Sequence, residues 1–204
     1  MSGWTSHSGM AVCLTQNNID TDQLIPARFM SQPRADGYQD FLLYDVRRKD
    51  NGEINPDYPL NRFTETSILI CGNNFGSGSS REAAAYALYD AGIRVVMATS
   101  FGDIFSANAV NNGVLPATLH IETHRILTEI VGTGSIQCDI DLQTKTVTMK
   151  QQQFNFELEA SWQTKLINGW DEIDLTLQHQ PHIDTFKAQY KKHHPWTWPQ
   201  TSKS

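Results

Sequence analysis

The sequence predicts an α/β fold in which a parallel β–α core is followed by a group of antiparallel strands. Apolar runs at residues 67–71 and 92–98 indicate buried strands, and each is followed by a helical stretch, at residues 83–88 and 101–112. A strand, a helix, a second strand and a second helix within about 45 residues form a parallel β–α unit. Further along the chain, short runs of partly alternating polarity indicate antiparallel strands at 135–141, 145–149 and 154–158.

Length and composition predict one soluble domain with a real core. The chain has 204 residues, so we expect a single domain over residues 1–204. Its net charge of −6 argues against nucleic acid as a partner. The sequence has no apolar run near the ~20 residues that a bilayer span needs, so we expect no membrane partner. Because the first residues lack a basic-then-apolar pattern, a cytoplasmic location is expected.

A glycine-rich turn between the first predicted strand and its helix is the candidate site. Gly76 and Gly78 allow backbone angles that other residues avoid. The sequence S-S-R-E at residues 79–82 fits a capping box, with Ser79 as the N-cap and Glu82 reaching back. Unpaired amides at a helix start and the planar guanidinium of Arg81 favour an anion. The pattern predicts an anion site, and an ordinary capped turn is the alternative.

The turn does not match the common phosphate-binding motifs. No Gly-Lys-Ser/Thr follows the glycines, which excludes a nucleotide P-loop. Arg81 stands where the third glycine of a dinucleotide fingerprint would fall. The turn is therefore not a P-loop, and it is a poor match to a dinucleotide fingerprint.

Two segments before this turn carry further polar candidates. Asp20 and Asp22 share one side of the chain if that stretch is extended, so one of them could orient an arginine or serine of the site; a solvated turn is the alternative. Residues 30–64 are polar and broken, which is typical of a substrate-binding or lid loop. Arg28 and Arg34 are the positive groups that this loop could bring to an anion, although either could be a surface arginine.

The cysteines and the C-terminal residues add little chemistry of their own. The three cysteines are odd in number and widely spaced, which excludes a disulfide framework and a C-x-x-C site, so each is expected to be a small buried residue. A cluster or metal used by this protein would then belong to another chain. Residues 160–168 predict a short helix, and residues 188–204 predict an irregular tail.

Four segments in chain order, at 18–29, 74–82, 95–116 and 168–177, together resemble the family of 3-isopropylmalate dehydratase small subunits. These are swivelling-domain partners in the aconitase superfamily. The resemblance implies a three-layer β/β/α swivelling domain that is active only as a heterodimer with a large subunit. That partner would carry a [4Fe–4S] cluster, and this chain would bind no metal. The implied reaction interconverts 2-isopropylmalate and 3-isopropylmalate through the dehydrated intermediate, in leucine biosynthesis.

The same resemblance assigns roles to individual residues. Ser79 would be the general base, and the iron of the partner's cluster would polarise the leaving hydroxyl. Asp22 and Asp20 would support these groups without touching the dicarboxylate substrate. The residues that would bind the substrate carboxylates are Ser80, Arg81 and Arg34.

This sequence departs from the family pattern at two positions. Ala83 stands where the family usually has histidine, and Ser77 stands where it often has cysteine. Two alternatives therefore remain: a related hydro-lyase of the methylmalate, citraconate or homoaconitate type, and a non-catalytic anion-binding module. The second alternative rests on Ala83.

Overall fold

The computed structural model describes residues 2–198, which divide into two compact units. The first unit covers Met1–Gly169 and the second covers Trp170–Ser204, whereas the sequence led us to expect a single domain. The second unit contains α7 (Glu172–Leu177) and α8 (Gln180–His193), neither of which has a buried residue. Its separation follows from this lack of buried apolar surface, because burial is what joins an element to a core.

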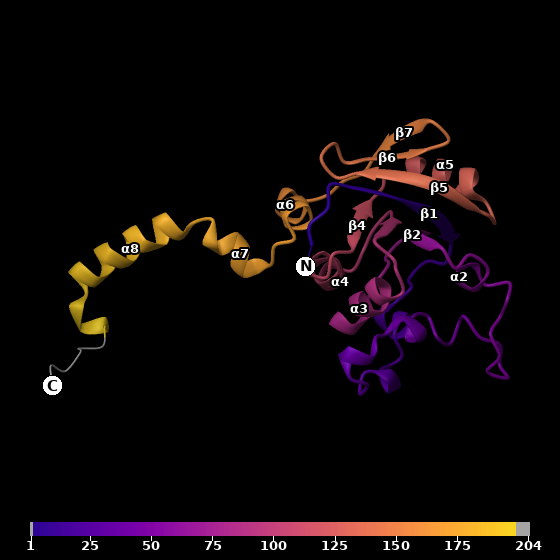
Figure 1. Ribbon diagram of the computed structural model, residues 1–204, viewed down its shortest axis with the longest axis horizontal. Helices are drawn as coiled ribbons and strands as arrows, with labels where there is room; N and C mark the ends of the chain where they lie inside the picture. Colours follow the sequence, from indigo (N-terminus) through magenta and orange to yellow (C-terminus); the bar gives the residue numbers. More distant parts are fainter. Residues whose placement is uncertain (1, 199–204) are drawn as a thin grey trace. The chain divides into compact units, whose positions relative to one another are not determined.

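One sheet of seven strands organises the first unit, in the order β4-β3-β2-β1-β5-β6-β7 (Figure 1). Strands β1 to β4 pair in parallel, and β1, β5, β6 and β7 pair antiparallel. The predicted parallel core and antiparallel strands are thus two halves of one sheet, joined at β1. The strands are β1 (Ser6–Leu14), β2 (Thr66–Cys71), β3 (Val95–Ala98), β4 (Leu115–Thr118), β5 (Ser135–Asp141), β6 (Thr146–Met149) and β7 (Gln152–Asn155).

Alternate residues of the parallel strands face two separate cores. Val12, Leu69 and Val96 lie in one core, with buried residues of α1 (Thr21–Leu24), α3 (Glu82–Asp90) and α4 (Asp103–Asn111). Ile68 and Met97 lie in the other, with residues of α5 (Ile121–Val131), α6 (Ala160–Asn168) and the antiparallel strands. Figure 1 shows α3 and α4 together and α5 near β5. Because side chains alternate along a strand, one short apolar run supplies both cores.

The structure differs from the sequence-based expectations at β7, at α5 and in the C-terminal residues. The last antiparallel strand is β7, not residues 154–158: Lys150 and Gln151 both have positive φ, and this tight turn pairs Met149 with Gln152. Helix α5 was not expected at all. The irregular tail predicted for 188–204 is wrong over residues 188–193, which complete α8; residues 199–204 lie outside the described part of the chain.

Residues 30–64 are more ordered than a loop. They contain two single 3₁₀ turns and α2 (Pro59–Arg62), and four of their side chains are buried in the core beside α3. These four are Tyr38, Leu42, Leu43 and Leu60. A substrate-contacting role for this segment stays a prediction, and any movement would have to leave these anchors in place.

Candidate active site

The glycine-rich turn after β2 lies at the carboxyl ends of three neighbouring parallel strands. The amide of Gly76 donates to the carbonyl of Ile19 at 2.7 Å, which ties the turn to the segment after β1. On the other side, the amide of Phe75 donates to the carbonyl of Ser100 at 3.1 Å, after β3. Ligands of open parallel sheets bind at such carboxyl ends. The turn therefore lies where the fold favours a ligand.

Backbone geometry explains the glycine at position 76. Gly76 has φ of +72°, a conformation that other residues rarely adopt, and a Cβ built on it would clash with the ring of Phe105. Gly102 approaches from the next loop, and its amide donates to the carbonyl of Phe75 at 2.9 Å. This close packing fixes the path of the turn before it reaches Ser79.

The structure contradicts the predicted capping box. Helix α3 begins at Glu82 with Arg81 in the N-cap position, and no side chain caps it. The carbonyl of Ser79 accepts a hydrogen bond from Oγ1 of the buried Thr21 at 2.9 Å, which holds Ser79 away from the helix start. Glu82 accepts from Nδ2 of Asn112 at 3.2 Å instead of reaching back. A contact between segments distant in sequence thus overrides the local capping pattern.

Ser100, three positions before α4, makes a similar contact between distant segments. The N-cap residue is Gly102, and Oγ of Ser100 accepts from the amide of Asn74 at 2.8 Å. Ser100 therefore supports the turn after β2 and does not cap its own helix.

Ser79 and Ser80 are exposed and offer free polar groups. Neither hydroxyl makes a hydrogen bond within residues 2–198, and the amides of Ser79, Ser80 and Arg81 have no acceptor there. Since Ser79 is not a cap, its hydroxyl is available for chemistry. Free amides and hydroxyls ahead of a helix are typical of anion sites.

Arg81, the N-cap residue of α3, forms an ion pair with Asp22 in α1, between Nη1 and Oδ1. The side chain of Arg81 is only 16% exposed, whereas that of Asp22 is 58% exposed. This contact matches the expectation that one carboxylate orients an arginine. Asp20 has a different position: its side chain caps α1 by accepting from the amide of Gln23 at 2.7 Å.

The two loop arginines do not contact the turn in the described chain. Arg34 pairs with Asp90 at the end of α3 and lies over the ring of Tyr86, 4.5 Å from its centroid. Position 86 is about one helical turn beyond the start of α3. Arg28 forms an exposed ion pair with Asp45. The structure therefore brings Arg81, Ser79 and Asp22 together and leaves Arg34 farther along the helix.

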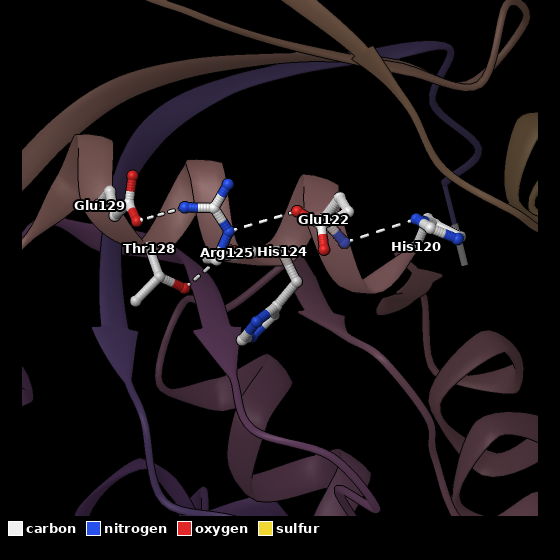
Figure 2. A network of polar contacts seen from close by, with 6 residues as sticks. All are labelled: His120, Glu122, His124, Arg125, Thr128 and Glu129. Atoms are coloured by element: carbon white, nitrogen blue, oxygen red, sulfur yellow. Dashed lines mark hydrogen bonds and ion pairs between the residues drawn. The ribbon is translucent and has the colours of Figure 1, made fainter.

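Helix α5, which was not predicted from the sequence, contacts the end of β2 from the face of the sheet opposite α3. Nε2 of His124 lies 2.7 Å from the carbonyl of Cys71, so this nitrogen donates. Figure 2 shows Arg125 between Glu122 and Glu129 along the exposed side of the helix, with His124 turned the other way. Charges spaced by three and four residues are a helix signal that could have revealed α5.

Neither metal-binding nor membrane-spanning features are found in the described chain. Among residues 2–198, no three His, Cys, Asp or Glu side chains are grouped so that they could hold a metal ion. No helix there combines the length and apolar character of a membrane span. The three cysteines are buried free thiols, as predicted. Burial raises the pKa of Cys13 to about 11 and of Cys138 to about 12, and it raises that of Cys71 well above its ordinary value.

The fold and the turn define a swivelling domain of the aconitase type. The family model of the aconitase C-terminal domain matches residues 1–122, and a model of the C-terminal domain of the 3-isopropylmalate dehydratase small subunit matches residues 172–199. The chain belongs to the family of 3-isopropylmalate dehydratase small subunits. The predicted swivelling-domain fold is thereby confirmed.

Individual relatives agree with this assignment. The chain is 43% identical over 187 residues to the 3-isopropylmalate dehydratase small subunit of Bacillus licheniformis, covering 90% of this chain and 94% of that one. It is 40% identical over 195 residues to the small subunit of Shewanella baltica, covering 93% and 97%. The crystal structure of 3-isopropylmalate dehydratase from Methanocaldococcus jannaschii is 25% identical, with a TM-score of 0.63, and the match covers 89% of this chain and 99% of that one.

Proposed function

We propose that this chain is the small subunit of a cytoplasmic 3-isopropylmalate dehydratase, a hydro-lyase of leucine biosynthesis. The reaction would interconvert 2-isopropylmalate and 3-isopropylmalate by dehydration and rehydration. Family membership supports the reaction class. The observation that carries the site is the exposed, unbonded hydroxyl of Ser79, two positions before an arginine that Asp22 holds in place.

The site suits removal of a proton beside a carboxylate. Such a step builds negative charge, which preorganised donors stabilise. We assign the proton abstraction to Ser79 in its alkoxide form, and the binding of a substrate carboxylate to Arg81, Ser80 and their free amides. The hydroxyl proton of Ser79 would first pass to solvent, to which this residue is exposed. Serine is a very weak acid, so the alkoxide forms only where positive groups stabilise it, and Arg81 and the start of α3 would supply that positive potential. Asp22 would act by orienting Arg81. Asp20 would act less directly, by capping α1, the helix that contains Asp22.

Arg34 keeps a proposed role that requires movement. Its guanidinium is engaged by Asp90, beyond the first turn of α3. Binding of a dianionic substrate would have to attract Arg34 from Asp90, because a second carboxylate needs a second cation. This role is therefore less supported than that of Arg81, which already lies in the turn.

The proposed partner is the large subunit, which would carry the [4Fe–4S] cluster. Iron–sulfur clusters are held by thiolates, and the three thiols of this chain are buried with raised pKa values, so they do not suit that purpose. The chain's own contribution is to bind and orient the substrate and to move a proton at Ser79.

Ala83 does not remove a group from the exposed side of the site. Its side chain is 8% exposed and packs in the core beside α3. Position 83 therefore faces inward, whereas Ser79 and Ser80 are exposed. This placement weakens the case for a non-catalytic module, which rested on the missing histidine.

Reconstitution tests the proposal. The purified chain should have no dehydratase activity alone and should gain it, under anaerobic conditions, with a cluster-loaded large subunit. Ser79→Ala and Arg81→Ala should each abolish turnover while the two proteins still co-elute. Arg28→Ala, which breaks an exposed ion pair elsewhere, is the matched control and should keep full activity. Normal turnover by the first two variants would refute the site, and faster turnover of methylmalate or homoaconitate would reassign the substrate.

A further inference from the structure

A cavity lies in the first unit, at the end of the parallel strands opposite the Ser79 turn. It has a volume of about 200 Å³, and its walls include Trp4, His7, Tyr89 and Arg94. Arg94 directly precedes β3, and His7 is the second residue of β1, so the cavity adjoins the amino ends of the parallel strands. Nothing in the proposed reaction uses it.

Arg94 is the charged group of the cavity wall, and in the described chain no carboxylate pairs with it. The ring of Trp4 lies in the same wall. Its indole Nε1 is covered by protein atoms and has no hydrogen-bond partner within residues 2–198.

The guanidinium of Arg94 is held in place but not neutralised. Its Nη1 donates to the carbonyls of Tyr89, at 2.8 Å, and Ile93, at 3.1 Å. The guanidinium carbon lies 3.8 Å from the centre of the Tyr89 ring. These contacts leave Nε and Nη2 unengaged and fix their direction, which is the arrangement that an arginine offers to a carboxylate.

His7 lies in the same wall, and its pKa responds to the positive charge of Arg94. Its Nε2 lies 2.8 Å from Oγ of Ser67, and its ring meets that of Trp4 edge-on, with 6.0 Å between centroids. Burial lowers the pKa of His7, and the positive charge of Arg94 lowers it further. His7 is therefore neutral at pH 7, and the cavity has one uncompensated positive charge.

We propose that this cavity binds a small organic carboxylate, with its oxygens on Arg94 and its short apolar part against the Trp4 and Tyr89 rings. The volume is below the roughly 300 Å³ at which pockets for drug-sized ligands begin, so the ligand has few atoms. Two aromatic walls favour an aliphatic tail over a bare anion such as phosphate.

Titration of the ¹⁵N-labelled full chain with 4-methylpentanoate, acetate and inorganic phosphate tests this site. The indole resonance of Trp4, assigned from Trp4→Phe, should shift saturably with 4-methylpentanoate. The pKa of His7 should rise on binding, because a nearby anion favours the imidazolium. Acetate should bind more weakly, since it lacks a tail. Equal binding of phosphate would overturn the carboxylate assignment, and unshifted Trp4 and His7 signals would overturn the site itself.

Variants separate this site from nonspecific binding. Arg94→Gln should weaken 4-methylpentanoate binding by about tenfold or more, because it removes a charged hydrogen-bond donor. Trp4→Phe should weaken it less, and it serves alone if Arg94→Gln fails to fold. Arg125→Gln, in the exposed charge row of α5, is the matched control and should bind normally. Wild-type affinity in both cavity variants would contradict the proposal without bearing on the Ser79 site.

Discussion

Arg81 pairs with Asp22, a carboxylate in α1, the short helix that follows the neighbouring strand β1. The side chain of Arg81 is mostly covered and that of Asp22 is mostly exposed, so the pair holds a largely covered guanidinium in one direction. Removing the aspartate would free the arginine to turn. Arg81 and Asp22 are 59 positions apart in sequence, so the site depends on how α1 meets the start of α3.

Asp22→Asn should raise KM for isopropylmalate by about tenfold and should also lower kcat. A misdirected Arg81 loses carboxylate binding, which appears in KM, and it no longer stabilises the Ser79 alkoxide, which appears in kcat. Steady-state kinetics of the reconstituted enzyme measure this. Asp45→Asn, which breaks the exposed pair with Arg28, should leave both constants unchanged. An unchanged KM in Asp22→Asn would mean that Arg81 needs no orienting partner.

Thr21→Val should lower both stability and activity. It removes the hydrogen bond to the Ser79 carbonyl, which is worth about 1 kcal/mol, and it releases the catalytic turn. Thr66→Val is the matched control, because Thr66 is also buried and donates to the carbonyl of Phe63 at 2.6 Å. Urea unfolding should show similar losses for both variants, whereas only Thr21→Val should lose turnover. Equal activity in the two would disprove the positioning role.

Gly76→Ala should destabilise the chain more than Gly92→Ala. Both glycines have positive φ, so each alanine costs about 1–2 kcal/mol of backbone strain. At Gly92 an added Cβ meets open space, whereas at Gly76 it meets the Phe105 ring and adds roughly 1–3 kcal/mol of overpacking. Thermal unfolding of both variants measures the difference. Equal melting temperatures would show that the turn relaxes easily.

Stability should fall between pH 9 and 10 because of the buried thiols. Their folded pKa values lie above the ordinary 9.0, so the unfolded chain loses its protons first and unfolding becomes easier as pH rises. Each thiol contributes a slope of up to about 1.4 kcal/mol per pH unit. Below pH 10 the partly buried Tyr58, whose pKa is also raised, contributes little. Urea unfolding across this range should show that the free energy of unfolding falls less steeply with pH in Cys138→Ala than in the wild type. An unaltered slope would mean that the Cys138 thiol does not contribute to the fall.

Local patterns predicted the parts of the site that depend on local forces. The strand ending at Cys71 and the glycine turn after it follow from apolar runs and backbone freedom, and both are present. The cap at Ser79 was mispredicted because Thr21, distant in sequence, competes for the same segment. The joining of both halves of the sheet through β1 could not be predicted, because no local signal specifies strand partners far apart.

Strand β1 also determines when the sheet can be completed during synthesis. It pairs with β2 on one side and on the other with β5, whose residues lie roughly 120–135 positions later. Pairing two strands so far apart in sequence closes a long loop, which costs entropy and is slow. One edge of β1 therefore stays unpaired until β5 has been synthesised and has left the ribosome. A nascent chain stalled before residue 135 would present that edge to other molecules, which makes this interval its time of greatest exposure to aggregation.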